Sequence, residues 1–161
     1  MTELLNSMDS NEARADAIKT RIESSLKQVR YDDPLKFEEF SVKIKKTIEE
    51  YDLSRDADKY FQQMEILAED FRQGISRSEY PSSIAADGDS KAFYGSIVVT
   101  LRNKGINVTN DIEESLATYA VKIKEVIVRN TKRDWKYNQM VHKDIHRALD
   151  DVLFDMFDSI G

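Results

Sequence analysis

The chain has 161 residues, a formal net charge of −6 and 34% charged residues, with only five glycines and two prolines. So many charges and so few turn-forming residues are typical of a helical protein, because a β-sandwich or barrel needs a turn signal every 8–12 residues or so. The absence of cysteine excludes a disulfide framework and a cysteine-ligated metal site. The negative charge argues against generic coating of nucleic acid, and no apolar run approaches the roughly 18 residues of a membrane span. The first residues resemble no signal peptide, so we expect an all-α cytoplasmic protein without a membrane partner.

Apolar residues at helical spacing predict two helices near the start of the chain. The first is expected to begin at a cap, Ser10 or Asn11, and to end near Val29. The second has Asp33 as its cap and Pro34 in the first turn, where the missing N–H does no harm. Their apolar stripes are Ala15, Ile18, Ile22, Leu26 and Val29, then Phe37, Phe40, Ile44, Ile48 and Tyr51.

A third helix is expected to open at Ser54 and to stop at Gly74. Its apolar residues are Tyr60, Phe61, Met64, Leu67, Ala68 and Phe71. The stretch 74–89 is rich in Ser, Gly and Pro, which predicts the main flexible loop. Residues 90–104 follow as a fourth helix, although the β-branched run Ile97–Thr100 leaves a strand as the alternative. The inward stripe expected for this helix is Phe93, Ile97 and Leu101.

Two further helices are predicted in the last third of the chain. Asn110 is expected to cap the fifth and Asn138 the sixth, with a polar connection over 130–137. Their inward stripes are Ile112, Leu116, Tyr119, Ile123 and Ile127, then Val141, Ile145, Leu149, Val152 and Met156. The prediction is a single compact domain of about six helices over 1–161.

The motifs of nucleotide-binding and hydrolytic enzymes are missing. The chain contains no GxxxxGK[ST], GxGxxG or GxSxG pattern. His142 and His146 share a helix face with Asp150, a spacing that can ligate a metal, but Lys143 stands where the zinc-protease motif needs Glu. We interpret the two histidines as a partly solvated pair at the edge of the core, with a metal enzyme as the alternative.

The segment 122–147 has a net charge of +5 in a chain that is negative overall. Trp135 and Tyr137 lie among its bases, and such a mixture can bind a phosphate backbone and stack on bases. The competing interpretation is that Trp135 anchors the connection to the core while the bases are solvated. The candidate DNA-contact residues are Lys132, Arg133, Trp135, Lys136, Lys143 and Arg147.

Two stretches, about 11–51 and 112–155, resemble a known family. The residues that carry the resemblance are Asn11–Ile18, Asp33-Pro34, Phe40-Ser41, Ile44, Thr47-Ile48, Asp134-Trp135, Asn138, Val141, Ile145, Asp150-Asp151, Leu153 and Asp155. In their order, and in the approach of the second stretch to the chain end, they resemble the C-terminal helical region of the motor and endonuclease (R) subunit of type I restriction enzymes.

The resemblance implies that the chain is a domain of a larger subunit. That subunit carries a nuclease domain and two motor domains that use ATP and Mg²⁺, and it is an ATP-dependent translocase and site-specific deoxyribonuclease. It assembles with methyltransferase and specificity subunits on double-stranded DNA. No position here matches the nuclease carboxylates or the Walker lysine, so this part is expected to be non-catalytic and to hold no cofactor.

The role implied for this domain is docking onto the methyltransferase core and support of DNA binding beside the motor domains of its own chain. Partner contact is expected near Tyr137 or along 54–89. The alternative function is a free-standing helical protein-interaction module without a DNA role.

Overall fold

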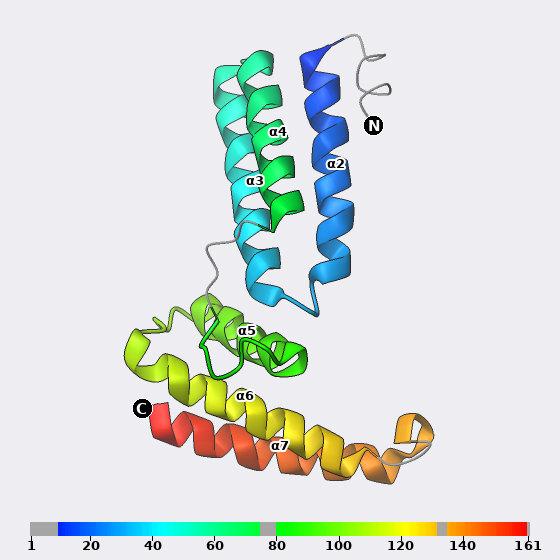
Figure 1. Ribbon diagram of the computed structural model, residues 1–161, viewed down its shortest axis with the longest axis vertical. Helices are drawn as coiled ribbons and strands as arrows, with labels where there is room; N and C mark the ends of the chain where they lie inside the picture. Colours follow the sequence, from blue (N-terminus) through cyan, green and yellow to red (C-terminus); the bar gives the residue numbers. More distant parts are fainter. Residues whose placement is uncertain (1–9, 75–79, 132–134, 161) are drawn as a thin grey trace. The chain divides into compact units, whose positions relative to one another are not determined.

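The computed structural model describes residues 10–74, 80–131 and 135–160. These residues form six α-helices and one 3-10 helix, with no strand among them (Figure 1). The prediction of an all-α fold with about six helices is therefore confirmed. The contacts of the chain divide it into two compact units, 1–79 and 80–161. The expectation that the whole chain acts as one domain stays a prediction.

The first unit is a bundle of three helices, α2 (Asn11–Val29), α3 (Pro34–Ser54) and α4 (Ala57–Gln73) (Figure 1). Each helix turns its predicted apolar stripe inward, and burial of these stripes is the main favourable term in the folding of the unit. The Phe40 ring meets the Phe71 ring edge-on, with 5.2 Å between centroids. The buried core consists of Ala15, Ile18, Ile22, Leu26, Phe40, Ile44, Tyr60, Met64 and Leu67.

Side-chain caps fix the starts of α2 and α3 where the sequence predicts them. Ser10 Oγ accepts the N–H of Ala13 at 3.2 Å, and Asp33 Oδ1 accepts the N–H of Lys36 at 3.0 Å. Gly74 ends α4 with a φ of 71°, a left-handed conformation that glycine adopts without steric cost. These three boundaries confirm the sequence prediction.

The predicted start of the third helix at Ser54 is wrong, because Ser54 is the last residue of α3. Arg55 then adopts a left-handed φ of 55°, and its N–H is donated to the Tyr51 carbonyl at 2.7 Å. Asp56 caps α4, with Oδ1 3.0 Å from the N–H of Lys59. Both Ser54 and Asp56 are residue types that cap helices well, so residue type alone does not decide which of them caps α4.

The second unit contains α5 (Gly88–Asn103), α6 (Asn110–Asn130), the 3-10 helix η1 (Trp135–Tyr137) and α7 (Gln139–Ile160). Helix α6 packs against both α5 and α7. Residues Ile97–Thr100 are helical, so the strand alternative is wrong. The buried apolar residues of this unit are Ile84, Tyr94, Val98, Leu101, Leu116, Ala117, Tyr119, Ala120, Ile123 and Met156.

Helix α5 differs from its prediction at its start and in its buried face. It begins at Gly88, because Asp87 caps it with an oxygen 3.4 Å from the N–H of Ser90, so the loop expected over 74–89 is too long by two residues. The inward face carries Ser90, Tyr94, Val98 and Leu101, whereas Phe93 and Ile97 are half-buried. Two adjacent apolar stripes are present, and only packing against α6 selects one of them.

The described part of that loop, 80–87, packs into the second unit. Pro81 and Ile84 are buried, and the Ser83 hydroxyl donates to Glu114 on α6 at 2.8 Å. Residues 75–79 lie outside the described residues, and the flexibility expected of the whole loop stays a prediction.

Of the two caps predicted for the last two helices, one is correct and the other is wrong. Asn110 is the first residue of α6 and not its cap; Thr109 holds the cap position without a side-chain hydrogen bond. Asn138 does cap α7, because its Oδ1 accepts the N–H of Met140 at 3.0 Å. Helix α7 rests on α6 along one face, and Met156 is its one fully buried residue.

None of the helices in the described residues combines the length and apolar character that crossing a bilayer requires.

Candidate nucleic-acid interface

Helices α6 and α7 form an antiparallel hairpin, and the connection between them holds the aromatic residues of the predicted DNA site (Figure 1). Trp135 in η1 is half-buried, and its ring lies 5.9 Å from the ring of His142 at 60°. Tyr137 is 89% exposed. The tryptophan therefore packs against the start of α7, and the tyrosine side chain is exposed to solvent.

Two predicted candidates, Lys132 and Arg133, lie outside the described residues. The other four are placed: Trp135 is half-buried, and Lys136, Lys143 and Arg147 are exposed. The structure thus brings part of the candidate set onto η1 and the first half of α7.

Two other bases of the segment 122–147 are neutralised within the second unit. Lys124 Nζ lies 2.8 and 2.7 Å from the two carboxylate oxygens of Asp87, and these bonds, with two from Ser90, lower the pKa of Asp87 to about 2. Lys122 Nζ lies 3.2 Å from Asp155 Oδ2, which lowers the pKa of that carboxyl. These lysines join α6 to the start of α5 and to α7, so they are poor candidates for phosphate contact.

Four cations near the end of the hairpin remain exposed. Each has no ion pair within the part of the chain that the structure describes. Two of them, Lys143 and Arg147, are four residues apart and share one side of α7. We call these four residues the hairpin cations: Arg129, Lys136, Lys143 and Arg147.

Acidic side chains limit the size of this positive surface. Asp144 lies among the hairpin cations, and Asp150 and Asp151 follow on the second half of α7; all three are exposed. The outside of α7 is therefore basic toward its start and acidic toward its end. A phosphate backbone would be attracted by the first half and repelled by the second.

The histidine pair does not come together as a metal site. His142 is half-buried, with its Nε2 atom buried and without a hydrogen bond to any described group, whereas His146 and Asp150 are exposed. Among the described residues, no group of three or more His, Asp or Glu side chains is arranged to hold a metal ion. The partly solvated pair is the interpretation that this arrangement favours.

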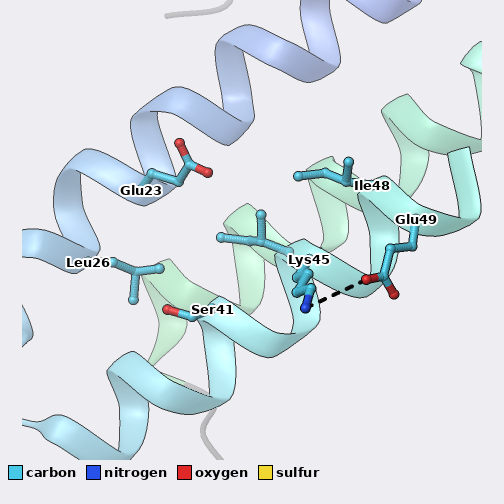
Figure 2. A pocket seen from close by; sticks show the side chains of 7 residues that line it. Glu23, Leu26, Ser41, Lys45, Ile48 and Glu49 are labelled. Carbon is cyan, nitrogen blue, oxygen red and sulfur yellow. Dashed lines mark ion pairs between the residues drawn. The ribbon is translucent and has the colours of Figure 1, made fainter. Parts of the chain in front are cut away.

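The first unit has a shallow groove of about 350 Å³ between α2 and α3 (Figure 2). Leu26, Ile44 and Ile48 form its apolar floor. Its charged groups, including Lys45 and Glu49 with an Nζ to Oε1 distance of 3.8 Å, stand on an exposed rim. The groove offers apolar surface but no converging set of acid, base and nucleophile.

Sequence reasoning missed several exposed apolar side chains on the second unit. Met140 and Phe154 are each 71% exposed and Phe157 is 48% exposed. The hydrophobic periodicity of α7 predicts its inward face. Apolar residues that lie outside this stripe could therefore have been identified from the sequence as exposed.

Comparison of the chain with protein-family models, with curated proteins and with solved structures finds no match.

Proposed function

We propose that this chain is a non-catalytic helical domain that helps a type I restriction motor subunit to assemble with its methyltransferase core, and that it contributes to DNA binding. The support is the resemblance of about 11–51 and 112–155 to the C-terminal region of such subunits. In this proposal the protein acts in the cytoplasm, and the ATP and Mg²⁺ of the reaction are bound by the motor domains.

The observation that carries the DNA role is the set of hairpin cations. A cation without an intramolecular partner can replace the counterions condensed on a phosphate backbone, and release of those counterions drives binding. Lys136 lies next to the exposed Tyr137, so charge and a stacking surface occur together on η1.

Such a surface positions DNA without reading its sequence, because backbone contacts carry no direct sequence information. The nearby Asp144, Asp150 and Asp151 oppose the same phosphates. Binding by the chain alone is therefore weak and salt-sensitive. In the assembled enzyme the motor domains supply most of the positive electrostatic potential that attracts the DNA.

The test is to replace Lys132, Arg133 and Lys136 by Glu and to measure binding to a duplex by fluorescence anisotropy over a salt series. The affinity should fall at low salt. The slope of log K against log salt should become shallower by up to about 2.7, because each phosphate contact contributes about 0.9. A matched control changes Lys27, Lys45 and Lys46, which are exposed in the first unit, to Glu.

An equal loss in the control would mean that only net charge matters, which contradicts a local DNA contact. If the triple variant of Lys132, Arg133 and Lys136 (the hairpin variant) folds and keeps the wild-type affinity and salt dependence, the DNA role is also refuted.

The second candidate, a protein-interaction module without a DNA role, is favoured by the pairing of Lys122 and Lys124 with Asp155 and Asp87. It would be the better description if the hairpin variant bound DNA normally. The docking role of the main proposal is tested separately: deletion of the domain from the motor subunit should impair co-purification with the methyltransferase core, and full assembly without the domain would refute that role.

A further inference from the structure

The side of α7 that faces away from α6 carries an ordered row of exposed residues. They follow one another at steps of three and four, which is the spacing of the contact positions in a coiled coil. The row has apolar residues at its two ends and charged residues at its centre. We call it the outer seam of α7: Met140, Lys143, Arg147, Asp150, Phe154 and Phe157.

Large apolar side chains in this row are left in water. Met140 and Phe154 are each 71% exposed and Phe157 is 48% exposed, on a helix whose other face already packs on α6. Single exposed apolar residues need no explanation, but a regular row at coiled-coil spacing marks a helix face that can pair with another helix.

We propose that the outer seam of α7 binds the outer seam of a second copy of this chain, with the two helices antiparallel. In antiparallel pairs the first contact position of one helix faces the second contact position of the other. The row 140, 143, 147, 150, 154, 157 is symmetric about the point between Ala148 and Leu149. Two copies can therefore pair along its whole length around a single two-fold axis.

The chemistry of the facing residues is complementary in this register. Arg147 faces Asp150 of the second copy, an opposite-charge pair formed twice across the axis. In a parallel pair each of these residues would instead meet its own copy and repel it. The charges therefore select the antiparallel arrangement.

The outer positions are complementary as well. Lys143 faces Phe154 of the second copy, so that an ammonium group meets an aromatic ring. Met140 faces Phe157 of the second copy, a contact of a thioether with a ring. Both pairs form twice, and both cover apolar surface that a single chain exposes.

Two features keep the association weak. Asp144 and Asp151 flank the same edge of the seam and approach each other across the pair, where like charges repel. A single pair of helices also buries less than the roughly 800 Å² per partner of a standard interface. The dimer therefore depends on protein concentration.

This inference does not rest on the proposed DNA role, although the seam shares Lys143 and Arg147 with the hairpin cations. Self-association is measured without DNA, and the triple variant that tests DNA binding leaves the seam intact. The DNA-binding proposal and the self-association proposal can therefore be refuted independently of each other.

The experiment is sedimentation equilibrium of the full chain over a range of concentrations, with variants that reverse the central charges. R147D and D150R should each raise the dissociation constant at least tenfold, because each places like charges opposite each other. The combined variant R147D/D150R exchanges the two charges and should restore association to near the wild-type level. E125K, which reverses an exposed charge on α6, is the control that should leave the dissociation constant unchanged.

The apolar contribution is tested by F154S, which should also weaken association, against V128S, a matched change at a residue of α6 that is 63% exposed. Circular dichroism establishes that every variant keeps the wild-type helix content. A chain that stays monomeric at all concentrations overturns the proposal and leaves the seam to a different helical partner. A dimer that tolerates both charge reversals, or that the exchanged pair fails to restore, overturns it too.

Discussion

Asp87 shows how one carboxylate joins three parts of the second unit. Its oxygens accept hydrogen bonds from the N–H and the hydroxyl of Ser90, which cap α5. They also accept two bonds from Lys124 on α6. These bonds favour the ionised carboxylate and so lower its pKa from 3.8 to about 2.

The lowered pKa predicts how stability changes with pH. A carboxyl whose pKa is lower in the folded state contributes stability that is present above pH 3.8 and is lost as the pH falls toward 2. We expect D87N to melt at a lower temperature than the wild type at pH 7, with a difference that shrinks as the pH approaches 2. Thermal unfolding followed by circular dichroism at several pH values measures this.

The control for this experiment is D89N, an exposed aspartate in the first turn of the same helix. It should have a smaller effect at pH 7, since no hydrogen bond joins it to α6. A D87N difference that stays constant down to pH 2 would contradict the role assigned to the ionised carboxylate.

At the level of the elements, helix boundaries depend on which polar side chain reaches the first free N–H groups. Asp33 was predictable because Pro34 follows it and fits the first turn of α3. The start of α4 was not, since Ser54 and Asp56 are both suitable and the left-handed turn at Arg55 decides between them. Capping residues are visible in a sequence, but the path of the chain that selects one is not.

We expect D33A to lower the free energy of unfolding by about 1 kcal/mol, because the N–H of Lys36 loses its capping acceptor. D32A is the matched control, an exposed neighbour outside the cap position, and should change stability much less. Urea denaturation of both variants gives the comparison. Equal effects from the two substitutions would mean that charge alone, and not the cap, stabilises this end of α3.

At the scale of the whole molecule, the described residues include two groups of buried side chains, one in each unit. Phe40 is fully buried in the first and packs edge-on against Phe71. We expect F40A to cost about 3–5 kcal/mol through the cavity that it leaves. Hydrogen exchange should then speed up in α2, α3 and α4 while α5, α6 and α7 keep their protection.

V42A, on the same helix at a position that is 61% exposed, is the control and should leave exchange unchanged. If F40A instead accelerated exchange equally in both units, the chain would unfold as a single cooperative domain, as the sequence first predicts.

The sequence by itself determined the helical class, the stripes of the first three helices and the caps at Asp33 and Asn138, because these follow from spacing and local hydrogen bonding. It also located the basic segment around Lys136 and Arg147. Only the tertiary structure decided which bases are neutralised, since Lys124 and Asp87 are far apart in the chain and meet through the packing of α6 on α5. Packing likewise selected one apolar stripe of α5 and left the outer seam of α7 exposed, because a sequence pattern shows which faces are apolar but not which of them finds a partner.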